Sequence, residues 1–493
     1  KRLSGIRVHP TSLPGEYGIG DLGPEAYRFV DFMHEAGQHL WQTLPVGPTG
    51  QYNCPYQCYS SFAGQPLLIS PALMCKDGLL TEEEKKDHPH FPSDRVDYAA
   101  VKEYKDALFK KAFPRFAALA AGHPLKEDYD RFCSRAEWLP DYAMFMAIRK
   151  SREETHWLTW EKKYRKPTKS QKAVIAREFE EEIAYEQFVQ WLFFRQWKLL
   201  REYANAKDVL LIGDIPIFVA EDSADVWSNP DIFQLDAKRR PTKVAGVPPD
   251  YFSEDGQLWG NPLYRWDVLK ETGYDFWVRR MTAMAELYDK VRIDHFIGFA
   301  NFYTVKAGSV NAREGHWKPG PGMDLFNCLR EKVPGMDVVA EDLGAVNARV
   351  RRLLKDSGYP GMKVLQFGFD GDRKTNPHHP SRIIENCLVY TGTHDNDTTL
   401  GWWKTRNEEE RKNVFLEVGI VDDKTIVPAM MRKAMMSSAK LAVLPMQDVL
   451  ELDGSCRMNL PSTLGSHNWT WRMLPGEASE EKAKKLRKLN RES

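Results

Sequence analysis

Eight short apolar runs, spread along the whole chain, constrain its fold most strongly. They are GIRVHP (5–10), HLWQTLPV (39–46), VLLIGDIPIF (209–218), VRIDHF (291–296), VVAEDLG (338–344), MKVLQF (362–367), LVYTGTHD (388–395) and LAVLPMQD (441–448). Each run is continuously apolar rather than alternating, which is typical of parallel strands that are buried on both faces. The chain therefore has eight candidates for strands of one parallel sheet.

Helical patterns lie between these runs. In residues 181–206 the apolar side chains recur at helical spacing, at Val189, Phe193, Trp197 and Leu200. Eight strands that alternate with helices predict an α/β fold, a (β/α)8 barrel. An open doubly wound sheet is the alternative, but no glycine-rich phosphate turn follows the first strand.

The spacing of the runs is uneven and indicates two large insertions in a single catalytic barrel that spans residues 1–493. The first, 60–205, would separate strands two and three, and it is rich in charged residues and helix formers. The second, 220–290, would separate strands three and four, and it is dense in Gly, Pro, Trp and Tyr. Long loops on a barrel commonly carry function. We expect a lid loop at 246–261, in which Tyr251, Phe252 and Trp259 offer apolar surface.

Composition excludes several classes of partner. Lys and Arg together number 69, as do Asp and Glu, so the formal net charge is zero. Nucleic acids and anionic membranes attract a basic surplus, and we expect neither as a partner. No apolar run reaches 18 residues, so we expect no membrane span. The seven cysteines form no Cys-x-x-Cys pair, which favours a reducing compartment. We expect the cytoplasm, or the plastid stroma if the source is a plant.

Carboxylates follow four of the apolar runs, at Asp214, Asp294, Glu341 and Asp395. A single carboxylate at a strand end is often just a helix cap. Four of them on four strands of a barrel converge on one cleft, because the active sites of barrels lie at the carboxyl ends of the strands. His295 and His394 stand beside two of them. The cluster indicates either acid/base chemistry or a metal site.

Arg292 helps to decide between these two chemistries. It lies two residues before Asp294 and therefore on the same face of a strand. A guanidinium there would keep the aspartate ionised and in place, whereas a metal site gains nothing from it. Without a metal, two of the carboxylates would act directly on a glycosidic bond, one as the nucleophile and one as the general acid/base. A purely structural ion pair would explain Arg292 and Asp294 equally well.

Several motifs carry a family resemblance. Arg292-Ile-Asp294-His295, Glu341 in AEDLG and His394-Asp395 in THDNDTT resemble the α-amylase superfamily. GIRVHPTSLPGEYGIGDLG, SSFAGQPLLIS, GDIPIFVAEDSADVW, GVPPDYFSEDGQLWGNPLY and RMNLPS…NWTWR resemble one branch of it nearly end to end. That branch is the 4-α-glucanotransferases, called amylomaltases or disproportionating enzymes. The resemblance implies a barrel without a separate C-terminal β-domain.

The resemblance also implies a role for each matching residue. Asp294 matches the nucleophile, Glu341 the general acid/base and Asp395 the third carboxylate, which steadies the charged transition state. Substrate-binding positions are matched by Arg292, His394, Asp214, Tyr56, Asp250, Trp259 and Asn468. Two positions depart from the family pattern: Gln51 replaces an early tyrosine, next to Tyr52, and Ser462 stands where glycine is usual.

The expected function is transfer of α-1,4-glucan segments to the 4-hydroxyl of an acceptor glucan or glucose, through a covalent glucosyl-aspartate. The alternatives are an α-glucan hydrolase of the amylase type and, more distantly, a non-catalytic sugar-binding barrel. Degenerate amylase barrels typically lose one carboxylate, and all three are present here. We expect no cofactor and no metal. The expected partners are maltooligosaccharides and α-1,4-glucans, bound by a monomer or homodimer.

Overall fold

Eight parallel strands form the centre of the computed structural model, which describes residues 2–250 and 253–489. They are β1 (Leu3–Arg7), β2 (Leu40–Gln42), β3 (Leu210–Ile215), β6 (Lys290–Ile293), β9 (Asp337–Ala340), β10 (Gly361–Val364), β11 (Cys387–Tyr390) and β12 (Leu441–Pro445). All eight coincide with the apolar runs, so the predicted strands are confirmed. They pair in the order β10-β11-β12-β1-β2-β3-β6-β9.

The two ends of this sheet meet and make it a barrel. The Ala340 amide at the end of β9 donates to the Pro360 carbonyl just before β10 at 2.8 Å. Apolar side chains from six strands fill the interior: Leu40, Ile212, Val339, Met362, Leu388 and Leu441. This packing is that of a (β/α)8 barrel and replaces the open-sheet alternative.

Helices surround the barrel. Those outside the large insertions are α1 (Pro24–Glu35), α13 (Met323–Lys332), α14 (Ala348–Ser357), α15 (Thr399–Lys404), α16 (Glu408–Val418), α17 (Ile426–Met435), α18 (Met446–Val449) and α19 (Glu480–Arg487). None of the helices in the described part of the chain is both long and apolar enough to cross a membrane.

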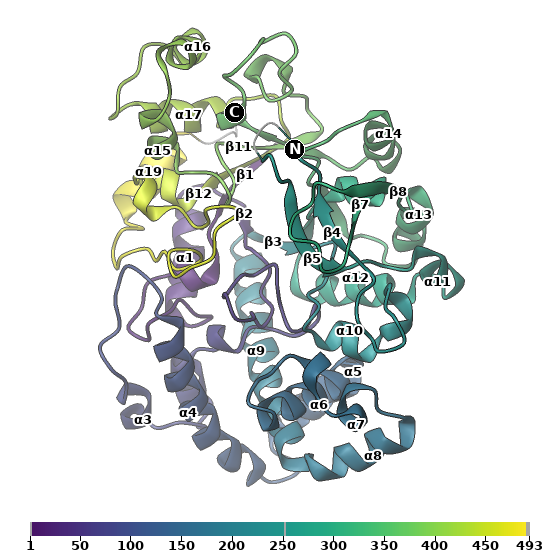
Figure 1. Cartoon of the computed structure of the whole chain (residues 1–493). Helices are drawn as coiled ribbons and strands as arrows, with labels where there is room; N and C mark the ends of the chain where they lie inside the picture. Colours follow the sequence, from purple (N-terminus) through teal and green to yellow (C-terminus); the bar gives the residue numbers. More distant parts are fainter. Residues whose placement is uncertain (1, 251–252, 490–493) are drawn as a thin grey trace.

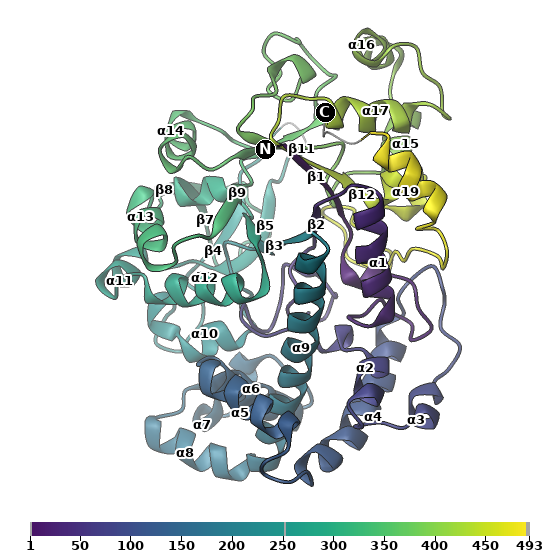
Figure 2. The same cartoon turned by 180° about the vertical axis from the view of Figure 1, so that it is seen from behind.

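A helical region follows β2. It comprises α2 (Pro71–Lys76), α3 (Glu82–Lys86), α4 (Tyr98–Ala117), α5 (Pro124–Arg135), α6 (Leu139–Ser151), α7 (Lys162–Arg165), α8 (Lys169–Glu178) and α9 (Glu180–Ala206). Figures 1 and 2 show α3 to α8 together at the end of the molecule below the barrel, with α9 running back toward β3.

Helix α9 joins this region to the barrel and confirms the helix predicted over 181–206. Its apolar face is buried at Val189, Phe193, Trp197 and Leu200. The Trp197 indole donates to the Leu287 carbonyl at 2.8 Å, and Leu287 ends α12, the helix before β6. The same side chain therefore contacts both the long helix and a barrel helix.

The segment between β3 and β6 differs from the loop that its composition suggests. It contains α10 (Ala224–Ser228), β4 (Lys243–Val247), β5 (Gln257–Pro262), α11 (Trp266–Glu271) and α12 (Asp275–Leu287). β4 and β5 join β7 (Asn301–Lys306) and β8 (Gly315–Pro319) in an antiparallel sheet of order β5-β4-β7-β8. Its central pair, β4 with β7, brings together residues about sixty positions apart. A local sequence pattern therefore does not predict this pairing.

Candidate active site

The four carboxylates follow four barrel strands. Asp214 is the fifth residue of β3, whereas Asp294 directly follows β6 and Glu341 directly follows β9. Asp395 lies five residues beyond Tyr390, where β11 ends, so a turn rather than the strand presents it. The carboxyl end of the barrel thus collects all four groups.

Arg292 of β6 connects two of these carboxylates. Its Nη1 donates to Asp214 at 2.9 and 3.0 Å and to Asp294 Oδ1 at 3.0 Å. Burial works against its charge, but the two aspartates raise the pKa of Arg292 well above its ordinary value. The guanidinium is therefore charged and holds Asp294 in a defined position.

Asp214 is the more deeply buried of the two, with a side chain 1% exposed against 28% for Asp294. The Tyr56 hydroxyl donates to its Oδ2 at 2.6 Å. Burial raises the pKa of Asp214 to about 6, against the effect of Arg292 and of the tyrosine hydrogen bond. Asp214 is consequently ionised at neutral pH and forms the inner half of the Arg292 ion pair.

Glu341 has the opposite charge state. Burial, reinforced by the nearby charge of Asp294 and opposed by Arg292, raises its pKa to about 8. Its two oxygens accept the backbone amides of His295 at 2.8 Å and Leu343 at 2.7 Å. One carboxyl is thus protonated at neutral pH beside an aspartate that an arginine holds, the pairing on which acid/base catalysis depends.

Asp395 is the most exposed of the group, with 51% of its side chain accessible. Partial loss of hydration works against its ionisation, but the neighbouring His394, the Asn459 amide and more distant arginines lower its pKa overall. Asn459 Nδ2 donates to Oδ1 at 2.8 Å, and His394 Nε2 lies 3.4 Å from Oδ2. Because burial lowers the pKa of His394 to about 4, this imidazole is neutral at pH 7. Asp395 therefore keeps its charge and faces the solvent.

Aromatic rings lie around the carboxylates. Tyr56 stacks on His394 with ring centroids 5.1 Å apart. Trp259 of β5 meets His295 edge-on, with centroids 4.7 Å apart. The structure therefore brings Tyr56 and Trp259, predicted as subsite residues, to the cluster of carboxylates. Tyr251 and Phe252, which we expected to add apolar surface to the lid, lie outside the described residues.

Two other predicted subsite residues are engaged differently. Asn468 is buried, and it accepts from the Leu460 amide at 2.9 Å and donates to Thr463, so it stabilises the loop from 460 to 468. Asp250 is exposed, and its carboxylate accepts from the Ser253 amide at 2.8 Å within the 246–261 segment. These hydrogen bonds lie within each residue's own loop, and the sugar-binding role of Asn468 and Asp250 stays a prediction.

The loop from 457 to 462 contains residues that the sequence alone did not single out. Asn459 contacts the Asp395 carboxylate, and Arg457 donates to the Asp395 carbonyl at 2.8 Å. Both belong to the RMNLPS motif (457–462), whose resemblance to the family implies no role for these two side chains. Ser462 in the same loop has φ of 63°, a left-handed conformation that favours glycine. A serine therefore occupies a backbone conformation here that glycine adopts at lower cost.

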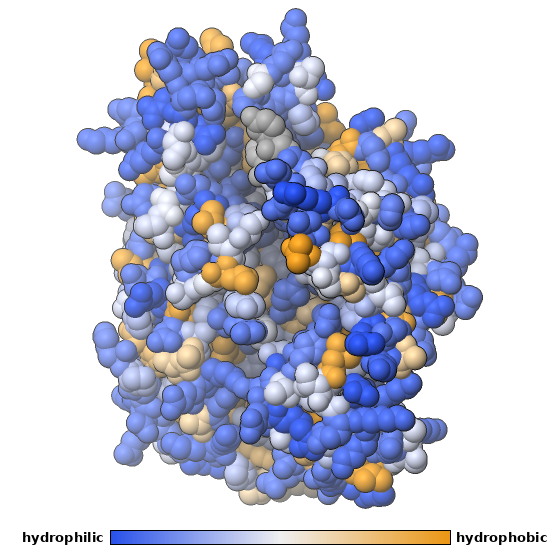
Figure 3. Space-filling model, viewed as in Figure 1, coloured by the Kyte–Doolittle hydropathy of each residue, from blue (hydrophilic) through white to orange (hydrophobic). Residues whose placement is uncertain are grey.

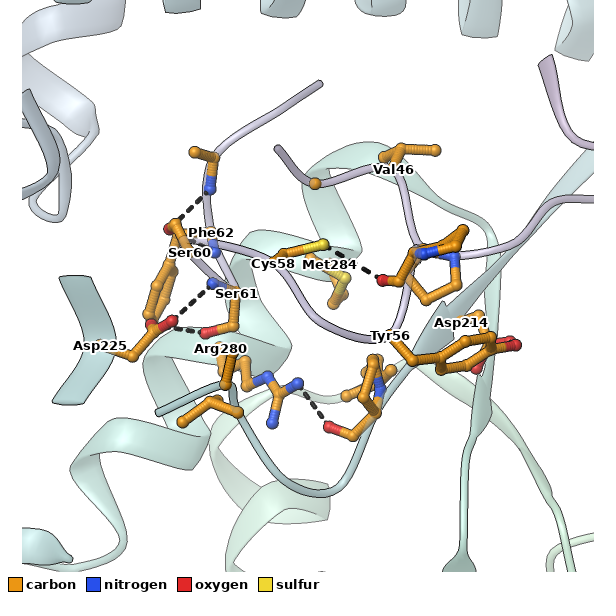
Figure 4. Close-up of a pocket in the computed structure, with 18 of the residues that line it drawn as sticks. Val46, Tyr56, Cys58, Ser60, Ser61, Phe62, Asp214, Asp225, Arg280 and Met284 are labelled. Atoms are coloured by element: carbon orange, nitrogen blue, oxygen red, sulfur yellow. Dashed lines mark hydrogen bonds between the residues drawn. The ribbon is translucent and has the colours of Figure 1, made fainter. Parts of the chain in front are cut away.

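A small chamber lies behind Tyr56 and Asp214. Figure 4 shows these two side chains on one side of it and Asp225, Ser61 and Arg280 on the other. Its volume is about 50 Å³. Small-molecule sites typically measure about 300–1,000 Å³, so a glucan does not fit there. The surface offers more room, because Figure 3 shows a hollow near the middle of this face with apolar side chains on both margins.

The donor groups do not resemble a metal centre. Within residues 2–250 and 253–489, no group of three or more His, Cys, Asp or Glu side chains is arranged to hold a metal ion. The strongest electrostatic partner of Asp214 and Asp294 is a guanidinium. The geometry fits chemistry by carboxyl groups alone.

Comparisons with known proteins agree with this geometry. A family model described as 4-alpha-glucanotransferase matches residues 8–477. The 4-alpha-glucanotransferase of Thermus thermophilus is 46% identical over 500 residues, covering 99% of this chain and 98% of that protein. The chloroplastic/amyloplastic 4-alpha-glucanotransferase of Solanum tuberosum is 42% identical, with coverage of 99% and 86%. An amylomaltase structure from Streptococcus agalactiae, in complex with acarbose, has TM-score 0.96 and 35% identity, covering 99% of this chain and 98% of its own.

Proposed function

The chain belongs to the 4-alpha-glucanotransferase family and transfers glucan segments, and we propose that it does so by a retaining double displacement through Asp294 and Glu341. The observation that carries the proposal is the placement of these two groups at the carboxyl ends of β6 and β9, one held by a guanidinium and the other buried against two backbone amides. Asp294 is paired with Arg292, whereas burial keeps Glu341 protonated at neutral pH. Retaining glycosidic chemistry needs one carboxylate nucleophile and one carboxylic acid.

In the first step the Asp294 carboxylate attacks the anomeric carbon of the donor. The glycosidic bond breaks, and its oxygen takes the proton of Glu341 and leaves as the 4-hydroxyl of the released chain. In the second step an acceptor 4-hydroxyl attacks the same carbon, the ester bond to Asp294 breaks, and Glu341 takes the hydroxyl proton. The anomeric configuration is inverted twice and so retained.

The other groups support these steps. Asp395, held by Asn459 and charged, faces the cleft and stabilises the positive charge that develops on the sugar ring. Arg292 and Asp214 hold the nucleophile. The chemistry needs no metal ion or cofactor, because a guanidinium supplies the positive charge beside the aspartates.

Transfer rather than hydrolysis requires that a sugar acceptor compete with water. Segment 246–261, which includes β5 and Trp259, is our candidate for the cover that excludes water and orients the acceptor. A positioned hydroxyl has a large effective-concentration advantage over a loosely placed water. We propose maltooligosaccharides and α-1,4-glucans as donors and acceptors, with Tyr56 and Trp259 as ring contacts. Because seven thiols are free, a reducing compartment such as the cytoplasm is the proposed location.

The products from maltotriose test this function. We expect glucose together with longer maltooligosaccharides, at a nearly constant number of reducing ends, because each transfer makes as many bonds as it breaks. Chromatography of the products and a reducing-end assay provide the measurement. A steady rise in reducing ends that matches the loss of maltotriose would identify a hydrolase instead.

A second experiment tests the covalent step. Glu341→Gln should fail to process natural glucans, whose leaving group needs a proton, but should still react with an α-glycosyl fluoride, whose leaving group does not. Mass spectrometry should then find a glycosyl adduct on the peptide that contains Asp294. The matched control, Asp294→Asn with Glu341→Gln, should give no adduct. An adduct on another residue, or normal turnover of maltotriose by Glu341→Gln, would contradict the assignment.

A further inference from the structure

A second hollow lies on the small antiparallel sheet and shares no lining residue with the catalytic cluster. Its volume is about 390 Å³, within the range of about 300–1,000 Å³ that is typical of small-molecule sites. Strands β4, β7 and β8 form one wall, and the start of α11 forms another. Figure 1 shows these strands and α11 near one another on the same side of the molecule.

The strand register explains why this wall is basic. Lys243 of β4 lies opposite Lys306 of β7, and Phe302 of β7 lies opposite Lys318 of β8. Directly opposed residues in antiparallel strands project to the same face. The other face of the sheet is the apolar cluster around Val244, Tyr303 and Val305. The lysines therefore project from the same open face of the sheet.

Charge in the hollow is unbalanced. Lys243, Arg265 and Lys318 line it, and Asp267 contributes the one carboxylate among its lining residues. None of the three cations forms an ion pair with a carboxylate in the described part of the chain. The local excess is thus about two positive charges, in a protein whose formal net charge is zero. An anion with about two negative charges would neutralise it.

The floor of the hollow is aromatic. Trp266 is only partly buried, and its ring lies 4.9 Å from that of the buried Tyr264. Phe302 of β7 also lines the hollow. A partly exposed indole offers a flat apolar surface next to the cations, as the apolar face of a sugar ring requires. The hollow therefore combines a sugar platform with an anion-binding wall.

We propose that this hollow binds a phosphate monoester carried on a hexose. A phosphate monoester has a charge of roughly −1.5 to −2 at pH 7, which matches the local excess, and its oxygens accept charge-assisted hydrogen bonds. The hexose would lie against Trp266. The phosphate could belong to a free sugar or to a phosphorylated unit of a glucan. This site is separate from the transfer site and goes beyond the proposed function.

Binding to purified variants tests the proposal. The probes are glucose 6-phosphate, inorganic phosphate, a phosphorylated dextrin and, as neutral control, maltose, each titrated by calorimetry at low and high salt. Lys243→Gln with Lys318→Gln removes two cations from the hollow. Lys169→Gln with Lys484→Gln removes two exposed lysines elsewhere, so it matches the change in net charge. Melting temperature and maltotriose transfer, which should be unchanged in both double variants, verify the fold.

We expect glucose 6-phosphate to bind the wild type and the control variant with similar affinity, and this affinity should fall as the salt concentration rises. The Lys243/Lys318 variant should bind it at least about tenfold more weakly. Equal binding to both double variants, or no binding to the wild type, would overturn the site. If inorganic phosphate binds as tightly as glucose 6-phosphate, the proposed contact between the hexose and Trp266 is wrong. Binding of the dextrin as tight as that of the free sugar phosphate would identify a glucan-borne source. Failure of the maltotriose assay would contradict the proposed function without changing these binding results.

Discussion

At the scale of single residues, the charge states of the site depend on Arg292 and on what surrounds each carboxyl. Asp214 shares the guanidinium with Asp294 and also accepts from Tyr56, whereas Glu341 is held by two backbone amides. We therefore infer that Tyr56 is a positioning residue, which acts on the proposed nucleophile Asp294 through Asp214 and Arg292. This arrangement leads to two predictions.

Tyr56→Phe should lower kcat/KM by about tenfold, because it removes one hydrogen bond from a buried carboxylate, a loss of about 1–3 kcal/mol. It should also raise the pKa of Asp214, since that hydrogen bond lowers it. The acid limb of the pH profile of kcat/KM should therefore move to higher pH. Tyr52→Phe is the matched control, because the Tyr52 ring is half-exposed. An unmoved acid limb would show that Tyr56 acts only through substrate contact.

The pH profile of the wild type should be bell-shaped. As pH rises through about 8, Glu341 loses the proton that the leaving group needs, and kcat/KM falls. As pH falls through about 6, Asp214 becomes protonated and no longer balances Arg292, and kcat/KM falls again. Initial rates with maltotriose at subsaturating concentration provide the measurement. Constant kcat/KM from pH 7 to 10 would contradict the acid role of Glu341.

At the scale of secondary-structure elements, β5 joins the small sheet to the cleft. It pairs with β4. The ring of its Trp259 contacts the ring of His295, the residue that directly follows Asp294. The His295 backbone amide in turn holds Glu341. A change in β5 is therefore transmitted to the acid/base as well as to the cover over the cleft.

Trp259→Ala should lower the transfer rate a few-fold and raise the hydrolytic share. It removes an aromatic contact worth about 0.5–1.5 kcal/mol and part of the cover that excludes water. The measurement is the number of new reducing ends per transfer event with maltotriose. Val310→Ala, an exposed apolar residue between β7 and β8, is the control. If the variant forms as many new reducing ends per transfer event as the wild type, Trp259 does not contribute to the exclusion of water.

At the scale of the whole molecule, α9 connects the helical region to the barrel. Its Trp197 is buried between Phe193 and Tyr288 and is bonded to the end of α12. Helix α12 leads directly into β6, which carries Arg292. The stability of the helical region and the position of the catalytic strand thus depend on one interface.

Trp197→Ala should destabilise the protein by about 3–5 kcal/mol, because it leaves a cavity and an unpaired carbonyl. Urea unfolding followed by circular dichroism provides the measurement. Leu199→Ala on the exposed side of the same helix is the control, and it should change stability by less than about 0.5 kcal/mol. Equal effects of the two changes would mean that the α9 interface contributes little.

Much of the fold and the centre of the site were predictable from local patterns. Buried parallel strands need continuous apolar residues, so all eight strands could be predicted from the sequence. The helical spacing of apolar residues likewise predicted α9. Parallel strands in a barrel end at one face, so Asp214, Asp294 and Glu341 could be placed together without coordinates. The turn that presents Asp395 beyond β11 lay outside that rule, because it depends on Asn459 and Arg457 of a distant loop.

The sequence by itself determined the barrel, the order of its strands along the chain and the carboxylates at their ends, because period and position are local properties. Only the tertiary structure decided the charge states and the partners. Whether Glu341 keeps a proton depends on its burial, and the hydrogen bonds of Asp214 to both Arg292 and Tyr56 depend on contacts across separate strands and loops. The small sheet and its basic hollow also depend on distant contacts, because β4 pairs with β7, about sixty residues later in the chain. The register of that pairing determines which side chains lie on the open face of the sheet. Such contacts are non-local, and a one-residue shift in register would exchange the two faces of the sheet.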